Sequence, residues 1–170
     1  SEGEALAREN YDNDGNRYQL QVPGVNSTWR TVLEETSSRI PYALLGIMPD
    51  DQTLVVWANP ESTRPAGLYT LNPDTDELEP VDRETEGRVT ESFILDKNRH
   101  VIAYTFEGVR PSYDFLDDDI DAAYASLTQQ LRGATATLES FSDDLQKLIF
   151  RIETGMGGAG AYVLLDRQTG

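Results

Sequence analysis

Cysteine is absent from this sequence of 170 residues. Its absence excludes disulfides, thiolate catalysis and zinc–thiolate sites. No apolar run approaches the roughly 18–20 residues that cross a bilayer, and no basic-then-apolar segment resembles a secretory signal. If the parent protein is exported, its signal lies upstream of Ser1 or has been removed. The lack of cysteine does not decide the compartment, although a periplasmic or secreted location is slightly favoured over the cytoplasm.

Basic residues are scarce, since 14 Lys and Arg stand against 30 Asp and Glu, for a formal net charge of -16. Such a surface repels phosphate backbones and anionic membranes. We therefore expect neither nucleic acid nor a membrane as a partner. Solubility or salt tolerance explains the acidity as readily as a cationic substrate does.

Histidine occurs once, at His100. A Ser-His-Asp mechanism needs a histidine oriented by a carboxylate beside an activated serine, and no G-x-S-x-G turn supplies that serine. His100 falls at the entry of a repeated strand, where a later copy has Lys147, so we interpret it as a strand-edge residue. We predict that the chain by itself is not an enzyme and has no catalytic, metal-binding or cofactor-binding residue.

A phrase made of a polar turn and an apolar strand occurs three times in the sequence. Its copies span residues 48–57, 94–104 and 141–150. Their first aspartates, Asp50, Asp96 and Asp143, lie 46 and 47 residues apart. A second phrase follows each copy, at residues 69–73, 113–117 and 162–166. A fixed period of this length, built from turns and strands, is typical of β-propeller blades.

The period predicts a mainly β fold, a partial β-propeller of about three to four blades with one inserted amphipathic helix. The blade-like repeats cover about 18–40, 41–88, 89–133 and 134–170. Closed propellers typically have four to eight blades of four strands. We therefore expect the chain to be about half of a seven- or eight-bladed ring.

Strands are predicted where apolar residues alternate with polar ones or run continuously between turn signals. They are expected at residues 18–22, 29–33, 42–47, 54–58, 69–71, 78–81, 89–95, 101–106, 134–139, 148–152 and 162–165. Residues 1–17 are polar and are expected to end in a turn at Asn13-Asp14-Gly15-Asn16. The continuous apolar run at 54–58 predicts a strand buried on both faces.

The period changes between residues 117 and 132, where Ile120, Tyr124, Leu127 and Leu131 recur at helical spacing. An amphipathic helix is expected there, ended by Gly133. Four aspartates lie at its start: Asp117, Asp118, Asp119 and Asp121. Helix capping explains most of them, but they could also hold the amino group of a substrate or a metal, and we keep them as candidate substrate contacts.

Other motifs have a plain structural interpretation. Residues 155–160 match G-x-G-x-x-G, but a strand follows at once, so we predict a hairpin loop and no dinucleotide site. Residues 12–16 hint at a calcium loop, but Arg17 and Pro23 stand at the sixth and twelfth positions, where an EF-hand needs glycine and glutamate. Asn26-Ser27-Thr28 is a glycosylation sequon that matters only in a eukaryotic secreted parent. Trp29 and Trp57 are expected to pack within blades.

Taken together, several phrases resemble the N-terminal β-propeller of the prolyl oligopeptidase family of serine peptidases, particularly its acylaminoacyl-peptidase and dipeptidyl-peptidase-like branch. They are Ser142-Asp143-Asp144 before an apolar strand, Gly67-Leu68-Tyr69-Thr70-Leu71, the ending at 162–170, and the segment 113–117 that leads into a helix. The resemblance covers residues 18–170.

The resemblance implies a propeller that restricts access of peptide substrates to a C-terminal α/β-hydrolase domain, which carries the serine, aspartate and histidine. None of those catalytic motifs occurs in this chain. In the dipeptidyl branch a pair of glutamates on a propeller helix grips the substrate amine, whereas the helix here has aspartates. That difference puts exopeptidase specificity in doubt.

The sequence leaves three interpretations open. The first is a non-catalytic propeller segment that gates and orients peptide substrate for a hydrolase domain of the same parent. The second is a stand-alone binding or scaffold propeller without enzymatic activity. The third is self-association of two half-rings through their open sheet edges.

Overall fold

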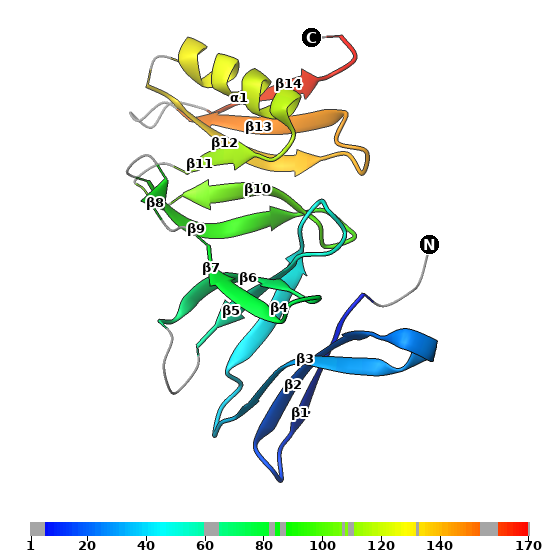
Figure 1. The fold of residues 1–170 in the computed structure, drawn as a ribbon. Helices are drawn as coiled ribbons and strands as arrows, with labels where there is room; N and C mark the ends of the chain where they lie inside the picture. The colour runs from blue at the N-terminus through cyan, green and yellow to red at the C-terminus, as the bar shows by residue number, and fades with distance from the viewer. Residues whose placement is uncertain are drawn as a thin grey trace. The chain divides into compact units, whose positions relative to one another are not determined.

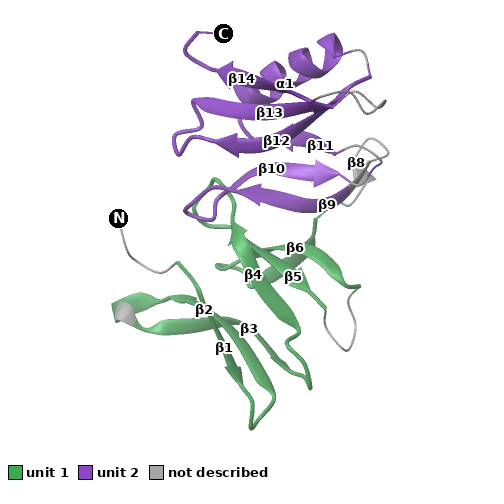
Figure 2. Ribbon diagram, turned by 180° about the vertical axis from the view of Figure 1, so that it is seen from behind, with its two compact units in different colours: residues 1–81 green, residues 82–170 purple. Residues whose placement is uncertain are grey.

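The computed structural model describes residues 6–59, 65–81, 84–85, 88–106, 108, 111–131, 133–153 and 160–169. The chain is divided into two compact units, residues 1–81 and 82–170, which Figure 2 shows in different colours. Each unit contains two antiparallel sheets that follow one another along the chain (Figure 1). The mainly β class predicted from the sequence is confirmed.

Unit 1 contains a three-stranded sheet in the order β1-β2-β3 and a four-stranded sheet in the order β4-β5-β6-β7. The strands of the first sheet are β1 (Arg8–Asp12), β2 (Arg17–Pro23) and β3 (Trp29–Thr36), with the short 3-10 helix η1 (Val25–Ser27) between the last two. Those of the second are β4 (Tyr42–Ile47), β5 (Leu54–Ala58), β6 (Gly67–Asn72) and β7 (Glu77–Pro80).

The core of unit 1 lies between its two sheets. Alternate residues of β2, namely Tyr18, Leu20 and Val22, point to one side and are buried. They form one cluster with alternate residues of β5 (Leu54, Val56 and Ala58). The period of two in the sequence therefore determines which face of each sheet is buried.

Unit 2 contains a four-stranded sheet in the order β11-β10-β9-β8, a three-stranded sheet in the order β12-β13-β14, and the helix α1 between them in the chain. The elements are β8 (Glu84–Thr85), β9 (Arg88–Leu95), β10 (Val101–Phe106), β11 (Ser112–Phe115), α1 (Asp118–Gln130), β12 (Thr135–Phe141), β13 (Lys147–Glu153) and β14 (Ala161–Asp166).

Aromatic rings join the helix to both sheets of unit 2. The ring of Tyr124 on α1 stacks on Phe150 of β13, with centroids 5.5 Å apart, and meets Phe115 of β11 edge-on at the same distance. Ile120, one turn earlier on α1, is 1% exposed in the same cluster. The predicted apolar stripe of the helix is confirmed as the packing face.

One turn recurs in three sheets, between β4 and β5, between β9 and β10, and between β12 and β13. In each copy the backbone N–H of the first residue donates to the carbonyl that closes the turn, as Met48 to Thr53, Asp96 to His100 and Ser142 to Lys147. The fourth residue in each copy has positive φ, at Asp51 (58°), Arg99 (68°) and Leu145 (55°). The geometry thus repeats although its residues differ.

The equivalent turn positions are Met48, Asp96 and Ser142, which lie 48 and 46 residues apart. The aspartates that mark the phrase in the sequence occupy different places within it, since Asp50 is the third residue of its turn, Asp96 the first and Asp143 the second. Alignment by Asp50, Asp96 and Asp143 is therefore out of register with the structure.

A second local geometry recurs at the ends of other strands. Asp12, Asn72 and Asp166 each accept a hydrogen bond from the backbone N–H two residues later, at 3.1, 2.9 and 3.0 Å. Asp117 does the same at 3.0 Å, but there the chain continues into α1. The helix thus begins at the position where the other sheets make an Asx turn.

Several expectations need correction. Strand β1 lies within residues 1–17, where no strand was predicted, and the third sheet begins with β8, before residue 89.

Trp57 is 39% exposed, so β5 is not wholly buried on both faces and this tryptophan is not a fully packed residue. The helix ends at a C-cap of Leu131, so Gly133, with a φ of 92°, lies one position beyond C′ and not at C′ as predicted. The loop at 155–160 falls almost entirely outside the described residues.

Candidate functional site

Asp117 caps α1. Its Oδ1 accepts hydrogen bonds from the backbone N–H groups of Asp119 and Ile120, at 3.0 and 3.1 Å. The guanidinium of Arg167, beyond β14, lies 3.1 Å from the same carboxylate. These contacts satisfy N–H groups that a helix cannot pair internally.

The other three aspartates of the helix start differ in their contacts. Asp119 lies 3.3 Å from Arg167. Asp121 accepts a hydrogen bond from the backbone N–H of Phe115 at 2.9 Å. Asp118 is exposed and forms no hydrogen bond or ion pair with the described residues. Of the candidate substrate contacts, Asp117 and Asp121 therefore bond the backbone at the helix start, whereas Asp118 and the ion-paired Asp119 are exposed to solvent.

The single histidine lies in a turn. The backbone N–H of His100 donates to Oδ1 of Asp96 at 2.8 Å. The Nδ1 atom of His100 is 3.5 Å from Oδ2 of the same carboxylate. Asp96 also accepts the backbone N–H of Asn98 at 2.8 Å, so this Asp–His pair belongs to the repeated turn.

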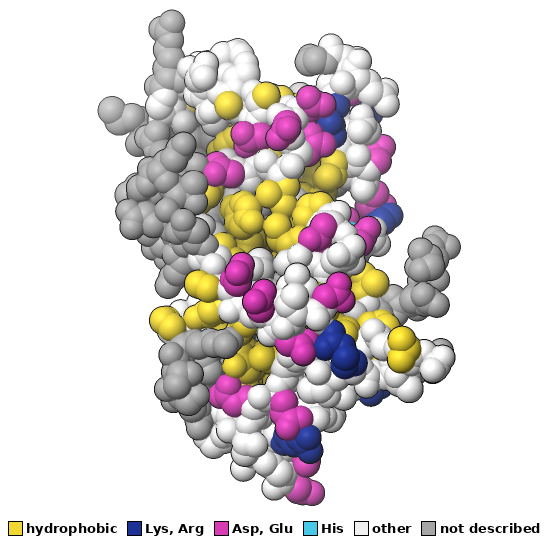
Figure 3. Space-filling model, in the orientation of Figure 1, with side chains coloured by type: hydrophobic (Ala, Val, Ile, Leu, Met, Phe, Trp, Pro, Cys, Tyr) yellow, Lys and Arg dark blue, Asp and Glu magenta, His cyan; other side chains and the backbone are white. Residues whose placement is uncertain are grey.

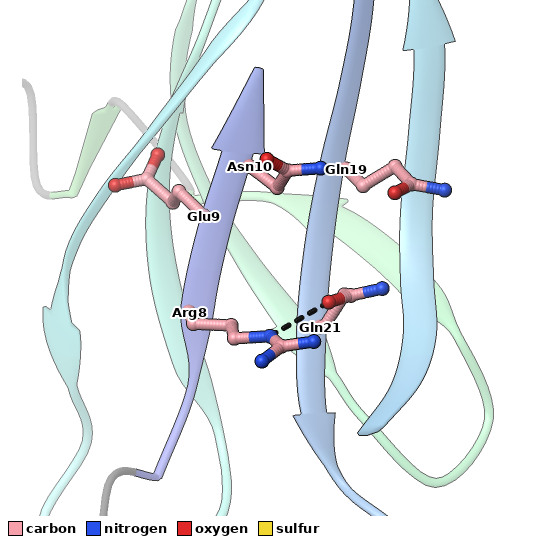
Figure 4. Close-up of a pocket in the computed structure, with 5 residues that line it drawn as sticks. All are labelled: Arg8, Glu9, Asn10, Gln19 and Gln21. Atoms are coloured by element: carbon pink, nitrogen blue, oxygen red, sulfur yellow. Dashed lines mark hydrogen bonds between the residues drawn. The ribbon is translucent and has the colours of Figure 1, made fainter. Parts of the chain in front are cut away.

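A polar hollow of about 550 Å³ lies on the first sheet of unit 1. Its lining comes from two adjacent strands: Arg8, Glu9 and Asn10 of β1, and Gln19 and Gln21 of β2. Figure 4 shows Arg8 and Gln21 joined by a hydrogen bond, from Nε to Oε1 at 2.7 Å, with Asn10 and Gln19 beside them. Glu9 points to the other side of β1, where it accepts a hydrogen bond from the Tyr18 hydroxyl at 2.8 Å.

Neighbouring groups hold the polar side chains of this hollow. The Arg8 guanidinium lies over the ring of Trp29, 4.4 Å from its centroid, a cation–π geometry. Gln21 donates to the Thr31 hydroxyl at 3.1 Å, and Gln19 donates to Glu34 at 2.7 Å. Because the Arg8 Nε is already paired, its terminal nitrogens are the donors that remain for a ligand.

Arg17 and Glu34 form an ion pair of 2.7 Å at one end of this network. The hydrogen bond from Arg17, supported by one from Gln19, lowers the pKa of Glu34, and the same bond to Glu34 raises the pKa of Arg17. Both side chains are largely exposed, so the pair contributes little to stability. The pair holds the Glu34 carboxylate, which accepts the hydrogen bond from Gln19 and so orients Gln19 at the rim of the hollow.

On the core side of the sheet, burial raises the pKa of Tyr18, with a further contribution from its hydrogen bond to Glu9. The Tyr18 hydroxyl therefore stays protonated and serves as a structural donor. The backbone N–H of Leu44 donates to the same Glu9 oxygen at 3.0 Å. Glu9 thus connects β1 to the second sheet of unit 1.

The described residues give no candidate for a metal-ligand cluster or for a membrane-spanning helix. No three His, Asp or Glu side chains of the described residues are grouped so as to hold a metal ion. The described helices include none that is long and apolar enough to cross a membrane. The hollow on β1 and β2 is therefore the candidate site that we consider further.

The sequence did not predict this hollow. Its lining depends on β1, whose residues Arg8–Asp12 have no apolar alternation that would announce a strand. Once β1 is paired with β2, Arg8 lies opposite Gln21 and Asn10 opposite Gln19. The alternation of Arg17, Gln19 and Gln21 in β2 was a signal that one face of this sheet is polar.

The fold and site together define a chain of consecutive antiparallel sheets with repeated turns and a polar hollow on the first sheet. Comparisons with protein-family models, with curated proteins and with solved structures find no match for the chain. The family suggested by the sequence phrases therefore remains a proposal.

Proposed function

We propose that this chain is a non-catalytic segment of a β-propeller that binds and orients a peptide. The observation that carries the proposal is the recurrence of one turn geometry in three sheets of similar size. Repetition of a sheet unit at a fixed period is what propeller blades have in common. Blades place loops and strand ends around a binding surface and need no chemistry of their own.

The first sheet provides a place for the peptide. Among the described strands β1 pairs only with β2, so its other edge has unpaired backbone groups. An extended peptide binds such an edge by adding a strand. The Arg8 and Asn10 side chains lie over the face of the sheet on the β2 side of β1 (Figure 4), where the terminal nitrogens of Arg8 and the amide of Asn10 can meet a carboxylate or other polar side chain of the peptide.

Binding at this edge is measurable through Trp29, because the Arg8 guanidinium lies on its ring. In a Trp57→Phe background Trp29 is the only tryptophan. Titration with a mixed-sequence hexapeptide library should change its fluorescence, and Arg8→Ala should weaken binding about tenfold or more, the value of a lost charge-assisted hydrogen bond. Arg39→Ala, elsewhere in unit 1, is the matched control. An unchanged spectrum, or equal binding by Arg8→Ala, contradicts the proposal.

The narrower proposal is that the peptide is a substrate and that the parent protein is a serine peptidase with a C-terminal α/β-hydrolase domain. Its support is the resemblance of the phrases at 67–71, 113–117, 142–144 and 162–170 to the prolyl oligopeptidase propellers. Sequencing of the coding region downstream tests it. A G-x-S-x-G turn followed by an aspartate and a histidine is expected. More repeats without a hydrolase would leave the alternative of a stand-alone binding propeller.

A further inference from the structure

The outer face of the last sheet of unit 2 has three exposed apolar side chains beside the ion pairs that Arg151 forms with Glu139 and Glu153. Ile149 of β13 lies directly opposite Leu164 of β14, and Arg151 lies opposite Tyr162, so these side chains share one face. Ile149, Leu164 and Tyr162 are 37%, 55% and 69% exposed. The residues between them on β13 point the other way: Leu148, Phe150 and Ile152 are buried against the preceding sheet.

The same positions are covered in the preceding sheet of unit 2. Tyr113 and Phe115 of β11 precede Asp117 by the spacing at which Tyr162 and Leu164 precede Asp166. Both aspartates accept the N–H two residues later, which fixes the alignment. Tyr113 and Phe115 are buried.

The cover over Tyr113 and Phe115 comes from Tyr124 of α1, whose ring centroid is 5.5 Å from each of theirs, and from the last sheet. Phe150 of β13 lies edge-on to Phe115, with ring centroids 6.4 Å apart. The backbone N–H of Leu138 on β12 donates to the Tyr113 hydroxyl at 3.2 Å. The covering sheet thus places an apolar side chain against Phe115 and a backbone N–H donor against the hydroxyl of Tyr113.

We propose that the face formed by Ile149, Tyr162 and Leu164 is the docking surface for a further antiparallel sheet of the same repeat, one that brings alternate apolar side chains and a backbone N–H for the Tyr162 hydroxyl. The proposal rests on the propeller-type repeat but not on peptide binding. A second copy of this chain is a poor occupant, because two molecules with a net charge of -16 repel each other.

The outer face of the first sheet provides an internal contrast. Apart from Trp29, whose ring lies under the Arg8 guanidinium, the side chains described there are polar or charged: Arg8, Asn10, Gln19 and Gln21. Such a face is satisfied by water and by its own hydrogen bonds. The apolar composition of the last sheet's face is therefore not a general property of the outer sheets of this chain.

The test is a tandem protein, the full chain with a second copy of residues 134–170 fused after Gly170, in which the appended copy carries Tyr162→Phe so that the original Tyr162 can be followed. Nitration of tyrosines is read by mass spectrometry of peptides. In the unextended chain Tyr162 should react readily and buried Tyr113 should not. In the tandem protein we expect Tyr162 to be protected to the level of Tyr113.

The matched control carries Phe150→Asp in the appended copy and should leave Tyr162 reactive. Unchanged reactivity of Tyr162 in the tandem protein would overturn the proposal. So would a concentration-dependent dimer of the unextended chain that Leu164→Asp abolishes in sedimentation equilibrium, because a second copy would then occupy the face. The nitration and sedimentation experiments do not depend on the Trp29 fluorescence titration. The docking proposal can therefore fail while peptide binding holds, and the reverse.

Discussion

At the scale of single residues, Asp117 serves several neighbours at once. Its carboxylate caps α1 through two backbone N–H groups and pairs with Arg167. Similar carboxylate contacts to backbone N–H groups shape the turns at Asp50 and Asp96. Part of the acidic composition of the chain is therefore explained by local structure, before any ligand is considered.

Replacing Asp117 with alanine should destabilise unit 2. The loss of an N-cap costs about 0.5–2 kcal/mol of unfolding free energy. Urea unfolding followed by circular dichroism measures this change. Asp118→Ala is the control, since Asp118 makes no contact with the described residues, and its effect should stay within about 0.5 kcal/mol. Equal effects of the two variants would contradict the capping role.

Asp50 should make part of the stability depend on pH. Partial burial raises its pKa, but the hydrogen bonds from Thr53 and Gln52 together outweigh burial, so the pKa is lowered from 3.8. A carboxyl group with a lowered pKa in the folded state stabilises the protein above its unfolded pKa. That contribution is lost as the pH falls from about 4 through the folded value.

Urea midpoints recorded between pH 6 and pH 3 test this contribution. Asp50→Asn, which keeps a hydrogen-bond acceptor but does not titrate, should lose less stability in acid than the unmodified chain. Asp118→Asn should follow the unmodified chain, because Asp118 is exposed and unpartnered among the described residues. If Asp50→Asn shows the same acid dependence as the unmodified chain, the role given to Asp50 is wrong.

At the scale of elements, the repeated turn requires a left-handed residue. Arg99 has a φ of 68°, which costs about 1–2 kcal/mol for a residue with a side chain. Arg99→Gly removes that cost but adds freedom to the unfolded chain, worth about 0.4–1 kcal/mol. We expect a net gain of up to about 1 kcal/mol in thermal unfolding, and a loss with the β-branched Arg99→Val.

The neighbouring residue provides the control for the turn. Asn98 is not among the residues with positive φ, so Asn98→Gly adds freedom to the unfolded chain without relieving strain and should destabilise. A stabilising Asn98→Gly, or a stabilising Arg99→Val, would mean that the turn geometry is not the one described.

The helix should contribute to stability through its packing face. Ile120→Ala removes a side chain that is 1% exposed in the core of unit 2, and such changes cost about 2–5 kcal/mol. Gln129→Ala, on the exposed side of α1, should change the unfolding free energy by less than about 0.5 kcal/mol. Chemical denaturation of both variants measures the difference. A small effect of Ile120→Ala on the unfolding free energy would contradict the role of α1 in the packing of the core.

The sequence predicted those elements whose apolar period is strong. The alternation at Tyr18–Val22 and the helical spacing from Ile120 to Leu131 were confirmed, because burial of one face fixes the conformation. Strand β1 was missed, since it is held by pairing with β2 and not by an apolar face of its own. The turn register was missed because a hydrogen-bond pattern tolerates Met48, Asp96 or Ser142 at one position.

At the scale of the whole molecule, the net charge of -16 sets the response to salt. Figure 3 shows Asp and Glu side chains spread over the face in view. Mutual repulsion destabilises a compact state, and salt shortens its range from about 30 Å at 0.01 M to about 8 Å at 0.15 M. The melting temperature should therefore rise with NaCl, although exposed ion pairs weaken slightly.

A variant with fewer charges controls for other salt effects. Asp14→Asn, Glu91→Gln and Asp118→Asn together remove three exposed charges and should reduce the dependence of the melting temperature on NaCl. A melting temperature that falls with salt, or an equal slope in the variant, would show that repulsion is not the dominant effect.

The central claim is that the sheets of this chain are blades of a propeller. A crystal structure of the whole parent protein tests it most directly. We expect consecutive antiparallel sheets arranged radially around one axis, with a further sheet covering Ile149, Tyr162 and Leu164. A parent in which these sheets pair into a two-layer sandwich, with that face open to solvent, would contradict it.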